Sequence, residues 1–337
     1  KPGPKPKATK AAPKPAPAPT PPSPPAPIQV ATAELAARVL AKRRLIPFTQ
    51  RINPRYDAGW VHKDIARRLE RFSDDVAKGL SPRLMILMPP RHGKSELASR
   101  MFPAWHLGRH PDHEMIACSY NVSLAMSFSR KVKEVFNDPS YQSVFDSRLN
   151  PDFQANEEWG LAGTRGGYVA AGVGGGITGK GAHVLLIDDP IKNAEEADSA
   201  DTREKLWDWY GSTAYTRLAP GGGVLVIQTW WHDDDLAGRL QVAMSEDPDA
   251  DQFELVKYPA IAEADEYLNP VTDLIEYDVS TETQAETGHT LIRTKGEPLH
   301  PQRYDLIKLN RIKKTIPNRF WAALYQQNPV PDDGAYF

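Results

Sequence analysis

Three adjacent residues, Gly93, Lys94 and Ser95, have the types and order that bind nucleotide phosphates. They complete the pattern G-x-x-x-x-G-K-[ST], although Met88 stands where its first glycine is expected. Gly93 lets the backbone approach a phosphate, Lys94 reaches the β- and γ-phosphates, and the Ser95 hydroxyl binds Mg²⁺. The residues predicted to bind ATP and Mg²⁺ here are Pro90, Arg91, His92, Gly93, Lys94, Ser95 and Glu96.

Two adjacent carboxylates, Asp188 and Asp189, follow a short apolar run at residues 184–187. A phosphate-binding loop of this kind needs an acid at the end of a neighbouring buried strand, where it holds Mg²⁺. Because adjacent strand residues point to opposite faces, the two acids can have different roles. We assign Asp188 to Mg²⁺ and Asp189 to the attacking water, with Glu195 or Glu196 as the alternative base. The predicted catalytic residues are Lys94, Asp188, Asp189 and Arg91.

Strands and helices must alternate along the chain to position these residues. Strands are expected at residues 84–88, 115–119, 184–187 and 224–228. Helices are expected at residues 28–44, 59–80, 122–136, 199–218, 235–244 and 301–327, with another beginning near Gly93. All-apolar strands that alternate with helices predict an α/β fold with a mainly parallel central sheet flanked by helices. The acidic, threonine-rich residues 262–290 are expected to form a loop or a small excursion.

Composition and charge exclude several protein classes. The chain has 337 residues, of which 40% are hydrophobic and 25% charged, as in an ordinary globular protein. No apolar run reaches the ~18 residues of a membrane span, and the single Cys118 cannot form an internal disulfide or a zinc cluster. The net charge of −2 hides an asymmetry, because residues 1–27 hold five lysines and no acid. Any contact with nucleic acid must therefore come from a local basic patch.

Together, these motifs make the chain resemble the ATPase domain of the large terminase subunit of tailed bacteriophages, the motor that packages DNA into proheads. The resemblance covers about residues 45–337 and is carried jointly by several segments. These segments are residues 47–48, 60–70, 89–96, 119–121, 128–130, 178–182, 188–193, 196–199, 207–210, 215–218, 229–240 and 324–329, with Tyr304 and Trp321.

The resemblance implies a fold, a reaction and partners. The fold would be a RecA-like sheet of the ASCE class of P-loop NTPases, in which another strand lies between the strands of the two phosphate-site motifs. ATP hydrolysis would drive translocation of double-stranded DNA into a prohead in the host bacterial cytoplasm. The partners would be the portal protein and the small terminase subunit, and the chain would form a homo-oligomeric ring on the prohead.

The resemblance also implies roles for residues outside the phosphate-binding loop. Gln50 would read the adenine edge, and Tyr56 or Trp60 would stack on the base. Thr229 and His232 would relay loss of the γ-phosphate to the DNA-gripping surface. The possible trans-acting cations are Lys180 and Arg239. The sequence departs from the family at Trp230 and Lys180, where arginine is common, and lysine cannot form the bidentate fork that arginine makes with phosphate.

Four segments are expected along the chain. Residues 1–27, with 12 prolines, would form a disordered Pro/Ala/Lys-rich tail, since proline favours extended polyproline II and builds no core. Residues 28–80 would form the helical, adenine-side region, and residues 81–260 the P-loop ATPase core. Residues 261–337 would form a helical linker toward the nuclease domain that the family usually carries. No nuclease activity is expected from this chain.

Other functions remain open at this stage. A helicase-like DNA translocase would need paired RecA-like domains, and the sequence shows one P-loop core. A nucleotide-gated assembly protein would bind ATP without hydrolysing it. A P-loop kinase would transfer phosphate to an acceptor instead of releasing it to solution. Measurements of ATP turnover and of where the phosphate goes separate these alternatives.

Overall fold

The computed structural model describes residues 1, 3, 27–177, 179–277 and 279–330. Most of the tail predicted at residues 1–27 lies outside these described residues, as does Thr178. The chain divides into two units, residues 1–36 and 37–337, and helix α1 (Pro27–Arg43) spans the boundary between them. The predicted helix at residues 28–44 is therefore present.

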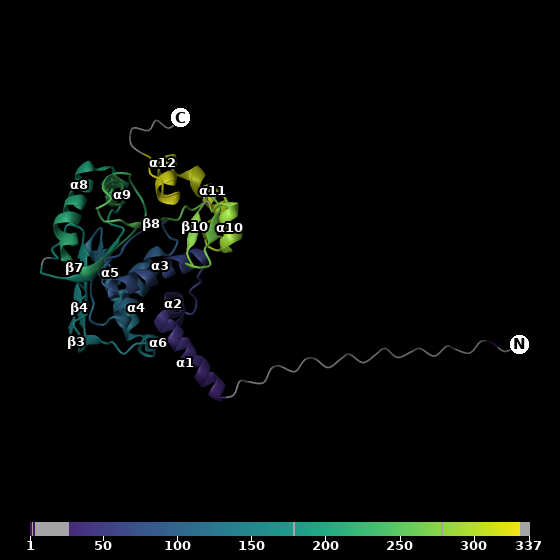
Figure 1. Ribbon diagram of the computed structural model, residues 1–337, viewed down its shortest axis with the longest axis horizontal. Helices are drawn as coiled ribbons and strands as arrows, with labels where there is room; N and C mark the ends of the chain where they lie inside the picture. The colour runs from purple at the N-terminus through teal and green to yellow at the C-terminus, as the bar shows by residue number, and fades with distance from the viewer. Residues whose placement is uncertain (2, 4–26, 178, 278, 331–337) are drawn as a thin grey trace. The chain divides into compact units, whose positions relative to one another are not determined.

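An eight-stranded sheet is the centre of the second unit, as far as the described residues show (Figure 1). In spatial order its strands are β3 (Leu149–Gln154), β4 (Glu158–Leu161), β5 (Gly167–Gly172), β2 (Glu114–Ser119), β6 (Ala182–Asp188), β7 (Leu218–Gln228), β1 (Arg83–Leu87) and β8 (Glu254–Lys257). The pairs from β5 to β8 are parallel, and β3 and β4 are added antiparallel at one edge.

The order of the central strands has a direct bearing on the site. Strand β1 leads into the phosphate-binding loop, and β6 leads into the two carboxylates. Strand β7 pairs with both of them and lies between them. This is the inserted strand that the sequence led us to expect. The α/β fold and the P-loop class are thereby confirmed.

Helices cover both faces of the sheet because successive strand residues point in opposite directions. In β1, Leu84 and Ile86 pack into one core, and Met85 and Leu87 into the other. The helices of the first core are α2 (Leu45–Ile52), α3 (Trp60–Ala77), η1 (Glu96–Met101), α4 (Phe102–Arg109), α5 (Val122–Asn137) and α6 (Pro139–Gln142). Those of the second are α7 (Ala194–Asp198), α8 (Ala200–Trp209), η2 (Tyr210–Ala214) and α9 (Leu236–Glu246), and the short η3 (Tyr215–Arg217) leads into β7.

The C-terminal part adds a second, smaller sheet. Its antiparallel strands lie in the order β10 (Ile275–Tyr277), β9 (Glu266–Leu268) and β11 (Thr290–Arg293). Residues 262–290 are thus an excursion with regular structure, which includes helix α10 (Thr281–Thr287). The chain then continues through α11 (Leu306–Thr315), α12 (Asn318–Phe320) and η4 (Trp321–Tyr325), where helix was expected. Among the described residues, no helix is both long enough and apolar enough to cross a bilayer.

Candidate active site

The loop between β1 and η1 carries the glycine-lysine-serine motif at the carboxyl end of the sheet. The Met88 N–H donates to the last carbonyl of β7 (3.1 Å). The first residue of the loop therefore continues the pairing between β1 and β7. Arg91 and Gly93 have φ angles of +65° and +95°. This left-handed conformation costs a residue with a side chain roughly 1–2 kcal/mol. A Cβ on Gly93 would lie 2.9 Å from His62 Nε2, so the close approach of His62 requires glycine here.

Two neutral histidines fix the shape of this loop. His92 Nδ1–H donates to the Pro90 carbonyl (2.9 Å), and His62 Nε2–H donates to the His92 carbonyl (2.9 Å). The His92 ring stacks on Tyr304 at a centroid distance of 4.8 Å. Burial lowers the pKa of both His62 and His92 to about 4, so both rings are uncharged near pH 7. The positive charge of the loop therefore comes from its arginine and lysine.

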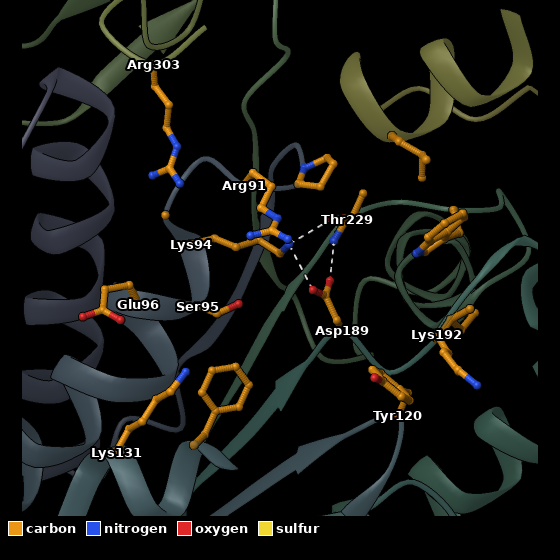
Figure 2. Close-up of a pocket in the computed structure, with 16 residues that line it drawn as sticks. Arg91, Lys94, Ser95, Glu96, Tyr120, Lys131, Asp189, Lys192, Thr229 and Arg303 are labelled. Carbon is orange, nitrogen blue, oxygen red and sulfur yellow. Dashed lines mark hydrogen bonds and ion pairs between the residues drawn. The ribbon is translucent and has the colours of Figure 1, made fainter. Parts of the chain in front are cut away.

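Lys94, Asp189 and Thr229 come from three separate segments and meet at one point (Figure 2). Lys94 Nζ lies 2.9 Å from Thr229 Oγ1 and 3.0 Å from Asp189 Oδ2. The Thr229 N–H donates to Asp189 Oδ1 (2.8 Å). Asp189 has a φ of +46°, which sets its direction at the end of β6. The carboxylate thus has one oxygen on a backbone amide and the other on the loop lysine.

Asp188 points to the other side of the strand end and accepts from two hydroxyls. Ser95 Oγ–H donates to its Oδ1 (3.1 Å), and Ser99 Oγ–H donates to its Oδ2 (2.5 Å). Burial, with the charge of neighbouring Asp189, raises the pKa of Asp188 to about 7. A buried carboxylate that lacks a full cationic partner gains from a divalent cation, and hydroxyl and carboxylate oxygens are the donors that Mg²⁺ prefers. Ser95 and Asp188 therefore fit a Mg²⁺ ion.

Sequence reasoning missed Ser99, the second donor to Asp188. It lies four residues after Ser95, so a helical turn places both hydroxyls on one side. Both residues lie at or just inside η1, a π-helical segment, and such segments are frequent at functional sites. The four-residue spacing of Ser95 and Ser99 is the feature of the sequence that could have identified Ser99.

A cavity of about 680 Å³ opens in front of these residues, and its wall is strongly basic (Figure 2). Five cationic side chains line it, and sequence reasoning did not single out Arg303 among them. The cations are Arg91, Lys94, Lys131, Lys192 and Arg303. The remaining lining residues are Pro90, Gly93, Ser95, Glu96, Tyr120, Phe128, Asp189, Ile191, Thr229, Trp231 and Leu324. Such a wall suits a polyanion of the size of a triphosphate.

A second cavity of about 410 Å³ shares Gly93, Glu96 and Arg303 with the first. It has several buried polar atoms that make no hydrogen bond with described residues, namely Tyr56 Oη, His62 Nδ1, His300 Nδ1 and His300 Nε2. Leaving such atoms unpaired is unfavourable. A ligand with polar edges would supply the missing partners.

Of the residues predicted for the adenine, Gln50 and Trp60 lie outside the two cavities. Gln50 is exposed, and its Nε2 is 3.5 Å from the Tyr56 carbonyl. The Trp60 ring packs edge-on against Tyr258 and lies 5.3 Å from the Arg293 guanidinium. Neither Gln50 nor Trp60 lines either of the two cavities, whereas Tyr56 lines the second.

The predicted coupling residues differ in their distance from the chemistry. Thr229 contacts Lys94 directly, as described above. His232 is buried and lines neither of the two cavities, and its Nδ1 accepts the Asp234 N–H (3.0 Å). Between them, the Trp230 N–H donates to Gln327 Oε1 (3.0 Å). The segment after β7 is thereby tied to the C-terminal part of the chain.

The other predicted cations and acids are already engaged within the chain. Lys180 Nζ lies 2.5 Å from Glu158 Oε1. Arg239 pairs with Asp234 and Glu204, each at 2.8 Å. The Glu196 carboxylate accepts the Lys192 N–H (2.9 Å), and neither Glu195 nor Glu196 lines the cavity. Arg91, by contrast, is exposed, lines the cavity and makes no hydrogen bond or ion pair with any described residue.

Comparison with known proteins gives one family. Residues 85–313 match the family model described as "Terminase large subunit, T4likevirus-type, N-terminal". No curated protein matches the chain.

Two solved structures are similar at low identity. The large terminase of bacteriophage HK97 is 16% identical with a TM-score of 0.43, over 73% of this chain and 50% of that one. A variant of the large terminase ATPase domain of Thermus phage P74-26 is 11% identical with a TM-score of 0.44, over 77% of this chain and 93% of that one. The chain thus spans about half the length of the HK97 protein.

Proposed function

This chain belongs to the family of terminase large subunits, and from that premise we propose that it hydrolyses ATP to drive double-stranded viral DNA into a prohead. The observation that supports the hydrolysis most directly is the meeting of Lys94, Asp189 and Thr229 beside a basic cavity. The proposed partners are DNA, the portal protein, the small terminase subunit and further copies of this chain in a ring. The proposed location is the host bacterial cytoplasm.

The nucleotide would bind across the two cavities. Its phosphates would lie in the larger one, against Lys94 and the amides at the start of the helix that follows the loop, where the helix dipole favours anions. Its base would lie in the smaller one, near Tyr56 and His300. Ser95 and Asp188 would hold Mg²⁺, which supplies positive charge to the β- and γ-phosphates when bound.

Asp189 is the proposed base. While no nucleotide is bound, its Oδ2 is paired with Lys94. When Lys94 turns to the phosphates, that oxygen becomes free to accept a proton from water. The water oxygen then attacks the γ-phosphorus, its proton passes to Asp189, and the bond to the ADP oxygen breaks. The Thr229 amide keeps Asp189 in place throughout this step.

A further cation would complete the site, either from the same chain or from an adjacent subunit. Arg91 is the proposed cation from the same chain, because it faces the cavity unpaired. Lys180 and Arg239 are the proposed cations from an adjacent subunit. Each would first have to leave its own carboxylate.

The test is Mg²⁺-dependent phosphate release from ATP at several protein concentrations, with Lys94→Ala and Asp189→Asn alongside. Lys94→Ala should abolish both ATP binding and turnover. Asp189→Asn should retain binding and lower turnover by ~10²–10⁴-fold, the usual loss when a positioned base is removed. Lys205→Ala is the matched control, since this exposed lysine pairs only with Asp201 on the surface.

The outcomes separate the proposed function from its alternatives. Turnover that rises faster than linearly with protein concentration supports a site completed by a neighbouring subunit. Tight ATP binding without turnover, even with DNA and portal protein added, would contradict the motor and support a nucleotide-gated assembly protein. Phosphate recovered on an acceptor would indicate a kinase.

A further inference from the structure

Arg303 is a cation that the sequence motifs do not identify and that the fold brings to the site. It precedes helix α11 and lies more than two hundred residues beyond the phosphate-binding loop. Figure 2 shows its guanidinium group pointing toward that loop, on the side of Glu96. It lines both the phosphate-side cavity and the second cavity. Arg303 therefore lies at the boundary between the two.

The Arg303 guanidinium has no partner among the described residues. It is exposed and makes no hydrogen bond or ion pair there. Other cations near the sheet are already neutralised, as Lys180 is by Glu158 and Arg239 by Asp234. A guanidinium that lacks a carboxylate and faces a basic cavity is suited to an anionic ligand, which it can bind with two parallel N–H donors.

The backbone that carries Arg303 is fixed against the loop. The N–H groups of Arg303 and Tyr304 both donate to the His300 carbonyl, at 3.0 and 2.9 Å. The Tyr304 ring stacks on His92, and the His300 ring packs edge-on against His62 at 4.9 Å. Arg303 thus lies between a contact with His92 of the phosphate-binding loop and a contact with His62 of α3, so little ordering of its backbone is needed when a ligand arrives.

We propose that Arg303 binds the α- and β-phosphates of the nucleotide, from the same chain. The inference rests on the proposed function, because it requires a nucleoside di- or triphosphate that spans the two cavities. The α- and β-phosphates are favoured because Arg303 borders both cavities, whereas Arg91 borders only the phosphate-side one. Arg303 would thereby connect nucleotide occupancy to the segment that leads into α11.

The experiment is calorimetric titration of the full chain with MgATP, MgADP and AMP. Arg303→Gln should weaken MgATP and MgADP by the same factor, about tenfold or more, as for lost hydrogen bonds to a charged group. The affinity for AMP, which lacks a β-phosphate, should fall by a smaller factor. Arg303→Lys should recover part of the affinity, because it restores the charge without the planar fork.

Two controls keep the result specific. Arg311→Gln removes an exposed arginine from α11 that lines neither cavity, and it should bind both nucleotides as the wild type does. The unfolding midpoint of Arg303→Gln without nucleotide should equal that of the wild type, because the exposed guanidinium makes no hydrogen bond or ion pair with any described residue.

Several outcomes would overturn the inference. Unchanged MgATP and MgADP affinity in Arg303→Gln would show that Arg303 does not touch the phosphates. A loss for MgATP alone would move the contact to the γ-phosphate and contradict the assignment. If the wild type binds no nucleotide while it is folded, the proposed function fails, and this inference fails with it.

Discussion

Arginines in two regions of this molecule differ in whether they have partners. In the small C-terminal sheet, Arg293 is 2% exposed, and its Nε donates to Glu266 Oε2 (2.9 Å) while one terminal nitrogen donates to the Pro259 carbonyl (3.1 Å). At the cavity, Arg91 and Arg303 have no partner among the described residues. The first region uses charge to hold the chain together. The second leaves charge available, which is what a site for an anion requires.

The site also contains backbone strain and a buried acid. Arg91 and Asp189 both have positive φ, and Asp188 is a buried carboxylate with hydroxyl partners only. Strain and incompletely neutralised charge cost stability, and they persist where the surrounding structure supports them. At this site they lie just after β1 and β6, whereas Ser81, Asp273 and Gln327 have positive φ elsewhere in the chain. Variants in the two regions should therefore differ in whether they lose stability or lose binding.

The largest expected effect is on stability, from Arg293→Ala. This change leaves Glu266 buried at 1% exposure without its partner, and breaking such a pair costs about 3–5 kcal/mol. Denaturant unfolding measures the loss. MgATP affinity measured at a temperature where the variant remains folded should not change. A double variant, Arg293→Met with Glu266→Gln, should recover most of the stability, and failure to recover would show that the pair is not the cause.

The second effect concerns pH and His62. Its pKa is lowered by burial to about 4 in the folded protein, against about 6.5 when unfolded. Between these values the unfolded chain binds more protons, so stability is lost as the pH falls from about 6.5 to about 4. His62→Gln, which keeps a donor for the His92 carbonyl, should remove up to ~3 kcal/mol of that acid-dependent loss. Unfolding curves at pH 7.5, 6 and 5 measure the slope.

Other buried histidines also contribute to acid sensitivity, so His62→Gln should reduce the slope without abolishing it. Burial lowers the pKa of His92 and of His106 as well. If the wild type and His62→Gln lose the same stability as the pH falls, His62 is accessible to protons in the folded state. The neutral-ring description of the loop would then be wrong.

The third effect compares Tyr56 and Trp60, the two aromatic residues that the resemblance offers for stacking on the base. Tyr56→Ala should weaken MgATP binding about 5- to 100-fold, since stacking on a base is worth ~1–3 kcal/mol. Trp60→Leu should change affinity by less than about twofold and should act on stability instead, because Trp60 packs on Tyr258 and Arg293. Calorimetry and denaturation on both variants decide between them. A larger affinity loss in Trp60→Leu would restore the role that the resemblance implies for Trp60.

Much of the fold could be predicted because its strands are short apolar runs. The strands expected at residues 84–88, 115–119 and 184–187 form to within one or two residues, whereas the strand expected at 224–228 begins six residues earlier, at Leu218. The strands β3, β4, β5 and β8 of the main sheet were missed; β5 has a glycine at each end, and only half of β4 is buried. In β5, a Cβ on Gly167 would lie 2.8 Å from the Trp159 carbonyl oxygen, so close packing of β4 against β5 requires a residue without a side chain.

The site could be predicted where residues are close in sequence, but not where they come from far apart. The loop motif and the Asp188–Asp189 pair are local patterns, and the structure brings Lys94, Asp189 and Thr229 together. Tyr56 was named only as one of two alternatives. Arg303 and His300 were not found, because they belong to a segment with no motif of its own and reach the loop only through tertiary packing.

The smallest expected effect is the change in stability of Arg91→Gly. Glycine removes the roughly 1–2 kcal/mol cost of a left-handed residue, but it also adds about 0.5–1 kcal/mol of unfolded-chain entropy. The net change should lie between zero and a gain of about 1.5 kcal/mol. Arg91→Ala, which keeps the strain, should show no gain, and both variants should weaken MgATP binding. Denaturation and calorimetry on this pair measure the two quantities separately. A clear loss of stability in Arg91→Gly would mean that the Arg91 side chain supports the loop, and the division between binding charge and structural charge would not hold at this residue.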